Sequence, residues 1–154
     1  MQDTAKILWG GYCVLTLVMV ICLLLAGMNV LEAVNHAFTT LATGGFSTKN
    51  ASAAAFSPAV QWIIIAFMFL AGINFTLHFR FITGGWNAYS KSEECRFFVL
   101  LCAVLIVLSS GYLYVSGAFP VQSFSDLERL IRGAAFQIVS LITTTGFVSE
   151  NYSL

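Results

Sequence analysis

Three long apolar runs alternate with two shorter segments of mixed polarity along the chain. The first run, Tyr12 to Met28, contains no charged residue, and the second, Pro58 to Leu77, contains three polar side chains. The third, Phe97 to Ala118, carries three serines in an otherwise largely apolar stretch. Because a helix needs about 20 mostly apolar residues to cross the hydrocarbon core of a bilayer, each run can span it. The pattern predicts an all-α membrane protein that crosses the membrane several times.

The two shorter segments are too polar to span and too rich in apolar and small residues to be ordinary surface loops. Each opens with a helix-start signal, in which a cap side chain and an acidic residue three positions later satisfy free amides of the first turn. These signals are Asn29 with Glu32 and Ser125 with Glu128. Each segment continues as a short helix, predicted over 31–42 and 126–142, and then breaks into Thr and Gly. Since twelve helical residues reach only about 18 Å, we predict two re-entrant pore helices.

The same order of elements occurs twice and predicts two pore-forming repeats, over residues 1–90 and 91–154. The first comprises an outer helix (7–28), a pore helix (31–42), a filter (43–48) and an inner helix (58–79). The second comprises an outer helix (97–118), a pore helix (126–142) and a filter (143–147), without a following inner helix. Gly45 and Gly146, 101 positions apart, align the two filters. The repeat rests more on this order than on sequence identity.

The Thr and Gly stretches at 43–48 and 143–147 are the candidate chemistry. Non-helical backbone at membrane depth costs several kcal/mol per unpaired group unless it lines a path filled with water or ions. A ring of carbonyl oxygens can replace the hydration shell of potassium, and glycine permits the torsions that aim successive carbonyls at one axis. The partly negative carboxyl end of each half-helix also favours a cation. The residues therefore predict a cation filter.

Three stretches resemble a known family. They are FTTLATGGFST at 38–48, GINFTLHF at 72–79 and VSLITTTGF at 139–147. The chain resembles the second and third repeats of TrkH-type potassium transporters, of the TrkH/KtrB/HKT superfamily, whose helix–re-entrant pore loop–helix repeats are potassium-channel-like. By this resemblance, the backbone carbonyls of eight residues form this chain's share of the potassium sites: Thr43, Gly44, Gly45, Phe46, Thr144, Thr145, Gly146 and Phe147.

The same resemblance implies a role and partners. It implies potassium uptake across a bacterial cytoplasmic (inner) membrane by a multi-pass protein, with K⁺ as the transported ion and no cofactor. Four repeats would surround one pore, so this chain is expected to be a fragment that supplies two of four filter strands. The implied partners are the remaining repeats, a second copy of the full-length subunit, a cytoplasmic nucleotide-binding regulatory subunit of the TrkA/KtrA type, and membrane lipid.

Composition narrows the function class further. Hydrophobic residues make up 58% of the chain and charged residues 9%, whereas soluble domains carry about 25% charged residues. The formal net charge of zero provides no basic footprint for a nucleic acid. The four cysteines form no CxxC pair, so we expect them to act as small apolar side chains. No Ser/His/Asp set, paired carboxylate or phosphate-binding loop is evident, and we predict no enzyme activity.

Charged residues orient the spans. Arg80, Lys91 and Arg96 crowd the connection between the second and third runs, which predicts a cytoplasmic position for that connection and for the N-terminus. The half-helices then enter from the opposite side. We expect His78 to form hydrogen bonds between helices or to lie at the membrane edge. His78 and Arg80 lie where their side chains are expected to reach toward the cytoplasmic surface. We expect Arg129 and Arg132 to stay in the outer interface.

Two alternative functions remain open on the sequence. The first is a sodium-preferring or cation-symporting relative on the same fold, whose selectivity is set in repeats outside this chain. The second, of another class, is a non-conducting membrane assembly subunit in which the half-helices only pack. The choice of K⁺ or Na⁺, the gating, any coupling to protons or sodium, and the identity of the regulatory partner are not assigned by these residues.

Overall fold

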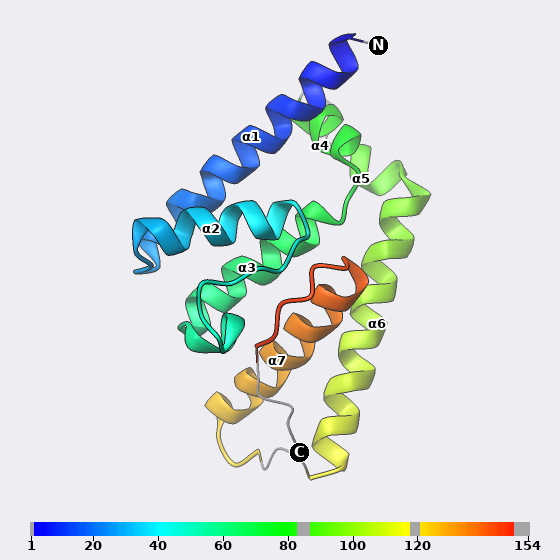
Figure 1. Cartoon of the computed structure of the whole chain (residues 1–154). Helices are drawn as coiled ribbons and strands as arrows, with labels where there is room; N and C mark the ends of the chain where they lie inside the picture. Colours follow the sequence, from blue (N-terminus) through cyan, green and yellow to red (C-terminus); the bar gives the residue numbers. More distant parts are fainter. Residues whose placement is uncertain (1, 83–86, 118–120, 150–154) are drawn as a thin grey trace.

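The computed structural model describes residues 2–82, 87–117 and 121–149, and its regular elements in these ranges are all helices (Figure 1). In chain order they are α1 Gln2–Leu25, α2 Val30–Leu41, the 3-10 helix η1 Ser52–Ala55, α3 Pro58–Ala71, α4 Phe75–Ile82, α5 Ala88–Lys91, α6 Glu93–Val115 and α7 Phe124–Ile142. The all-α membrane fold expected from the hydrophobic pattern is confirmed.

Within the described residues, α1 and α6 are the unbroken helices that are long and apolar enough to cross a bilayer. Their windows Leu8–Leu25 and Glu93–Val115 each have a mean hydropathy of 2.4. Both helices begin and end a few residues earlier than the predicted 7–28 and 97–118. Residue 118 itself lies outside the described residues. The helix ends are shifted because hydropathy locates the apolar span, whereas capping residues set where the helix begins and ends.

The end of α1 is set by a glycine. Gly27 has a φ of +91°, a left-handed torsion that glycine adopts without steric cost. The Met28 N–H then donates to the Leu23 carbonyl at 3.1 Å, and the Gly27 N–H donates to the Leu24 carbonyl at 3.0 Å. This pair of bonds is the Schellman motif, which satisfies carbonyls that the helix end leaves free. The chain can therefore turn at once into α2.

The start of α6 is set by a serine and two carboxylates. The Ser92 hydroxyl accepts a hydrogen bond from the Cys95 N–H at 3.3 Å, which caps the first turn. Glu93 and Glu94 follow in that turn, where the partly positive helix end favours negative charge. The helix therefore begins four residues before the apolar run that predicted it.

The inner helix expected as one span over 58–79 is broken, so the prediction of a continuous helix is wrong. α3 ends at Ala71, α4 begins at Phe75, and the two are bent by 96°. The Asn74 side-chain oxygen accepts a hydrogen bond from the Thr76 N–H at 3.0 Å. Such a local bond competes with helical pairing, which accounts for the break. Hydropathy could not reveal it because the apolar run continues across the bend.

His78 joins the two sides of this bend. It is buried, and the hydrogen bonding between helices that the sequence suggests for it is confirmed. Its Nε2 lies 3.0 Å from the Leu70 carbonyl of α3, and its Nδ1 lies 2.7 Å from the Tyr89 hydroxyl of α5. Because a carbonyl can only accept, Nε2 carries the proton and Nδ1 accepts from the tyrosine O–H. The ring thus ties α3, α4 and α5 together.

α2 begins as the sequence predicts. The Asn29 side-chain oxygen accepts a hydrogen bond from the Glu32 N–H at 2.8 Å. The helix runs from Val30 to Leu41, one residue earlier at each end than expected. An N-cap of this kind stabilises a helix by about 1 kcal/mol.

α7 begins differently, and the predicted pairing of Ser125 with Glu128 is wrong. The helix starts at Phe124, and the Asp126 carboxylate accepts a hydrogen bond from the Ser123 N–H at 2.9 Å. The capping signal is therefore displaced by two residues, because Ser123 and Asp126 have the same three-residue spacing. The displacement frees Glu128 for a contact with another helix.

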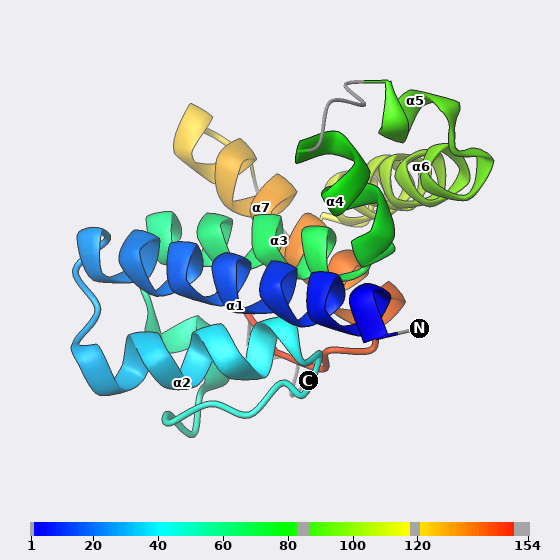
Figure 2. The ribbon, with the colours of Figure 1, turned by 90° about the horizontal axis from the view of Figure 1, so that it is seen from above.

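The half-helices pack into a shared core with α1 and α3 (Figure 2). Its side chains with no exposed surface include Met19, Leu23, Ala33, Ala37, Ile64, Met68, Phe136 and Phe147. α7 contacts α3 on one side and α6 on the other. This arrangement brings the segments that follow α2 and α7, cyan and red in Figure 1, close to each other.

The fold generates a prediction about topology. Figure 1 places the start of α1 with α4 and α5 at one end of the molecule, and η1 at the other. In intact cells, a thiol reagent that cannot cross the membrane should label Asn50→Cys, which is exposed just before η1, and spare Ser90→Cys, which is exposed in α5. The parent protein with its native cysteines gives the background. Labelling of position 90 alone would reverse the orientation.

Candidate functional site

The segments that leave α2 and α7 are held by the same backbone hydrogen bonds. After α2, the N–H groups of residues 44–45 both donate to the Thr39 carbonyl, at 2.7 and 3.3 Å. After α7, the N–H groups of residues 145–146 both donate to the Ser140 carbonyl, at 2.9 and 3.4 Å. The two sets are related by the 101-residue shift found in the sequence. The half-helices therefore end in the same way despite their different side chains.

The two segments also share an alternation of backbone torsions. Thr43 and Gly45 have φ values of +49° and +64°, and Thr144 and Gly146 have values of +58° and +82°. A left-handed torsion at a residue with a side chain costs about 1–2 kcal/mol, and it persists only where the surroundings impose it. The equivalent threonines carry this cost in both segments. Alternate left-handed residues re-aim the carbonyls between them, as a carbonyl-lined path requires.

Gly45 is the point at which the first segment meets the second. A β-carbon added at this position would collide with the Thr145 carbonyl, so no side chain fits. Gly146 has open space around the same position and requires glycine for its torsion alone. The two predicted filter segments are thus brought together by the fold, but their glycines serve different needs.

The second segment is also fixed to η1. The Ser52 hydroxyl accepts a hydrogen bond from the Val148 N–H at 3.2 Å, and the Val148 carbonyl accepts one from the Ala54 N–H at 3.2 Å. Residues almost a hundred positions apart are therefore bonded through their backbones. The linker after the first segment supports the second.

The two filter phenylalanines lie in different surroundings. Phe46 is 74% exposed, whereas Phe147 has no exposed surface. The Phe147 carbonyl accepts a hydrogen bond from the Ser140 hydroxyl at 2.9 Å, so one of its lone pairs faces α7. The shared geometry therefore covers residues 43–45 and 144–146 and does not extend to these two positions.

Oxygen atoms are the groups that this region offers to a cation. Within the described ranges, no group of three His, Cys, Asp or Glu side chains could hold a metal ion. The last turns of α2 and α7 contain no basic residue, so nothing on these helices neutralises the partly negative carboxyl ends that face the filter segments. Carbonyls and threonine hydroxyls near these ends can accept a dehydrated monovalent cation.

At the start of α2, a surface ion pair connects the helix with the chain beyond the first filter segment. The Lys49 ammonium lies 2.8 Å from the Glu32 carboxylate. This hydrogen bond holds the pKa of the half-buried Glu32 carboxyl below its ordinary value of 4.5. The Glu32 carboxylate neutralises the Lys49 charge. An approaching cation is therefore not repelled by an unpaired lysine.

Gly72, at the end of α3, packs against the base of the second segment. A β-carbon here would lie 2.8 Å from Thr143 Cγ2 and 2.8 Å from Phe98 Cζ. The Thr143 hydroxyl donates to the Val139 carbonyl at 2.8 Å, and it also lies 2.8 Å from the Thr145 hydroxyl. The end of the inner helix therefore contacts a residue that supports the filter segment.

Arg132, expected to stay in the outer interface as an anchor, is buried between α7 and α3. Its Nε donates to Glu128 Oε1 at 2.9 Å, and its Nη1 donates to Gln61 Oε1. Trp62 Nε1 donates to the same Glu128 oxygen at 2.8 Å. Gln61 in turn donates to the Ala53 carbonyl at 3.0 Å, so the contacts reach η1. We call Gln61, Trp62, Glu128 and Arg132 the polar cluster.

The sequence did not mark the polar cluster because its members come from two distant helices. A buried guanidinium is tolerated only when its donors are paired, and here a carboxylate and an amide oxygen accept them. The hydrogen bond from Arg132 holds the pKa of Glu128 below its ordinary value of 4.5. The cluster therefore fixes α7 at a defined height against α3.

The sequence also gave no sign of His36, which has no exposed surface. It lies on α2 and contacts one residue of each predicted filter segment, Ser47 and Phe147. A single histidine on a half-helix has no spacing pattern that would identify it. Only the fold shows which groups surround its ring.

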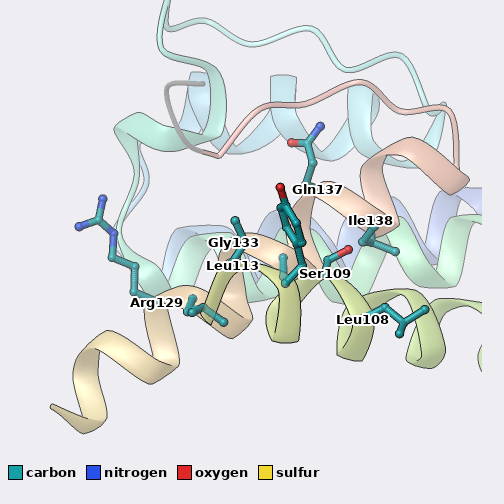
Figure 3. Close-up of a pocket in the computed structure, with 10 residues that line it drawn as sticks. Leu108, Ser109, Leu113, Arg129, Gly133, Gln137 and Ile138 are labelled. Carbon is teal, nitrogen blue, oxygen red and sulfur yellow. The ribbon is translucent and has the colours of Figure 1, made fainter. Parts of the chain in front are cut away.

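A cavity of about 400 Å³ lies between α6 and α7 (Figure 3). Leu108, Ser109 and Leu113 line it from α6, and Arg129, Gly133, Gln137 and Ile138 line it from α7. The Gln137 side-chain oxygen has no hydrogen-bond partner among the described residues. The cavity is mostly apolar and lies on the side of α7 that faces α6, away from the polar cluster.

The polar cluster generates a stability prediction. Arg132→Met should lower the free energy of unfolding by about 1–3 kcal/mol, because it leaves the buried Gln61 oxygen without its donor. Gln137→Met, on the same helix, should cost less because that oxygen has no partner to lose. Thermal unfolding of the purified protein in detergent measures both. Equal losses would mean that the cluster does not hold α7.

The same cluster predicts a dependence on pH. Because the folded-state pKa of Glu128 is lowered, its contribution to stability is present above about pH 4.5 and is lost as the pH falls through the lowered value. In Arg132→Met the carboxyl loses its donor, so this acid-induced loss should shrink. Unfolding curves recorded between neutral and acidic pH compare the two proteins. An unchanged pH profile in the variant would contradict the assignment.

The chain is similar to known transport proteins over nearly its full length. The family described as TrkH, cation transport protein, matches residues 1–154. The Trk system potassium uptake protein TrkH of Escherichia coli K12 is 36% identical over 151 residues, which cover 97% of this chain and 30% of that protein. TrkH of Halomonas elongata is 38% identical over 159 residues, which cover 98% of this chain and 30% of that protein.

A solved structure shows the same arrangement of helices. The crystal structure of the potassium transporter TrkH from Vibrio parahaemolyticus superposes with a TM-score of 0.88 at 36% identity. The match covers 97% of this chain and 32% of that chain, so the chain spans about a third of the length of these relatives. On its sequence and its fold, the chain belongs to the TrkH family of cation transport proteins.

Proposed function

We propose that this chain supplies two of the filter segments through which potassium ions are taken up across a membrane. The carbonyls proposed to contact the ion are those of Thr43, Gly44, Gly45, Phe46, Thr144, Thr145, Gly146 and Phe147. The observation that carries the proposal is the geometry common to the two segments: left-handed torsions and backbone hydrogen bonds that agree after a 101-residue shift. The support is stronger for residues 43–45 and 144–146 than for the two phenylalanines.

The energetic argument concerns the threonines at 43 and 144. Each holds a left-handed torsion that costs about 1–2 kcal/mol. Backbone strain of this kind is concentrated at functional sites. Its repetition at equivalent positions favours a path for ions over simple packing, which is the structural alternative for the half-helices.

The proposed ion is potassium. The relatives from Escherichia coli and Halomonas elongata are named as potassium uptake proteins, and the Vibrio protein as a potassium transporter. A carbonyl-lined path suits a dehydrated monovalent cation. Since the chain spans about a third of those proteins, uptake is proposed for a subunit that contains further filter segments. A sodium-preferring or cation-symporting relative is the conducting alternative.

Location and partners follow from the proposed function. The apolar helices and the relatives support a membrane protein, and we propose the bacterial cytoplasmic membrane. The resemblance to the family supports two further proposals: pairing of full-length subunits and a cytoplasmic nucleotide-binding regulatory subunit of the TrkA/KtrA type. A transport role needs no enzyme activity and no bound cofactor.

Glycine substitutions test the proposal in a full-length subunit that contains this chain. Gly45→Ser should reduce the preference for potassium over sodium most strongly, because the new side chain displaces the Thr145 carbonyl. Gly146→Ser should reduce it through its torsion alone, since space is open there. Reversal potentials in mixed potassium and sodium give the preference, and the amount of protein in the membrane is measured in parallel.

The matched control is Gly111→Ser in α6, where an added side chain meets nothing and the residue is helical. Gly72→Ser is unsuitable as a control because it would press on Thr143. The control should keep the preference of the parent. If both filter variants kept it as well, Gly45 and Gly146 would not line the ion path.

A further inference from the structure

His36 contacts parts of both filter segments at once. Its Nε2 lies 3.0 Å from the hydroxyl of Ser47, near the end of the first segment. Its ring stacks on Phe147 of the second segment, with centroids 5.7 Å apart and planes inclined by 18°. Phe56, in the linker after η1, meets the ring edge-on at 4.9 Å. One side chain from α2 therefore joins three segments that are separate in the sequence.

The hydrogen bonds define the state of the ring. Its Nδ1 lies 2.8 Å from the Glu32 carbonyl, which can only accept, so the proton is on Nδ1. In the neutral ring Nε2 then accepts a hydrogen bond from the Ser47 O–H. Burial lowers the pKa of His36, which keeps the ring neutral at physiological pH. The nearby charges are those of Glu32, one turn away on α2, and of its partner Lys49.

The Ser47 hydroxyl also forms a hydrogen bond with the backbone beyond the first segment. Its hydroxyl oxygen accepts a hydrogen bond from the Lys49 N–H at 3.1 Å while its proton is donated to His36. The direction in which the chain leaves residue 46 is therefore fixed from α2. On the other side of the ring, Phe147 is buried and its carbonyl is fixed by Ser140.

We propose that His36 is a positioning residue that sets the spacing of the two filter segments, and thereby the preference of the transporter for potassium over sodium. It acts by accepting the Ser47 hydroxyl from a ring that is packed on Phe147, and it does not contact the ion. The hydrogen bond to Ser47 is the contact that sets the spacing. The proposal rests on the proposed function, because it presumes that these segments line the ion path.

Two amide side chains separate the contributions of the ring nitrogens. Glutamine places its amide near the position of Nε2 and can accept the Ser47 hydroxyl, whereas asparagine reaches only to the position of Nδ1. In the full-length subunit reconstituted into vesicles, His36→Asn should lower the ratio of potassium to sodium flux by about 3- to 10-fold, the range of one hydrogen bond. His36→Gln should stay within about twofold of the parent.

Ser47→Ala provides a second route to the same contact and leaves the buried ring in place. It should lower the flux ratio as His36→Asn does, and the double variant should lose no more than either single one. Gln137→Asn is the control for shortening a polar side chain with a buried oxygen on the other half-helix, and it should keep the parent ratio. All fluxes are taken per amount of folded protein in the vesicles.

The outcomes distinguish this proposal from the one on which it rests. Unchanged flux ratios in His36→Asn and Ser47→Ala, with a reduced ratio in Gly45→Ser, would overturn the role of His36 and leave the filter in place. Unchanged ratios in all three would overturn both. Additive losses in the double variant, or equal losses in His36→Gln and His36→Asn, would show that the contact with Ser47 is not the cause.

Discussion

A polypeptide backbone must find hydrogen-bond partners within itself wherever water is excluded, and this constraint organises the chain. α2 and α7 each stop short, and the residues that follow recover bonds from the carbonyls of Thr39 and Ser140. η1 supplies a further pair to the second segment. The carbonyls that take part in none of these hydrogen bonds are the ones available to an ion. Two helical ends with the same geometry thus become a candidate path.

Polar side chains within the apolar core position these ends. His36 faces the filter segments, and Arg132 fixes α7 against α3. Each would be costly to bury alone, and each is buried with donors and acceptors matched. His78 joins α3, α4 and α5 in the same way at the bend between α3 and α4. The core is therefore apolar in bulk, and its few polar contacts decide where the helices sit.

The hydrophobic pattern located the two long spans and the two half-helices to within a few residues, because burial in lipid demands long apolar runs. The bend after Ala71 was missed since Asn74 acts through its own neighbouring amide inside a run that still reads as a span. The Thr and Gly stretches proposed as filter segments could be singled out because they follow capped half-helices. His36 and Arg132 could not, since their partners come from other elements and a single sequence contains no record of such contacts.

The polar cluster has a consequence for how the chain assembles. In lipid, apolar helix surfaces associate without strong preference for one neighbour, because the surrounding tails are equally apolar. The contact of Arg132 with Gln61 fixes one register of α7 against α3. Sliding or rotating either helix would break this hydrogen bond. The interface between α3 and α7 therefore carries the information by which the two repeats recognise each other, and the connection through α5 is not needed for it. Parts made as separate polypeptides would still have the means to find each other.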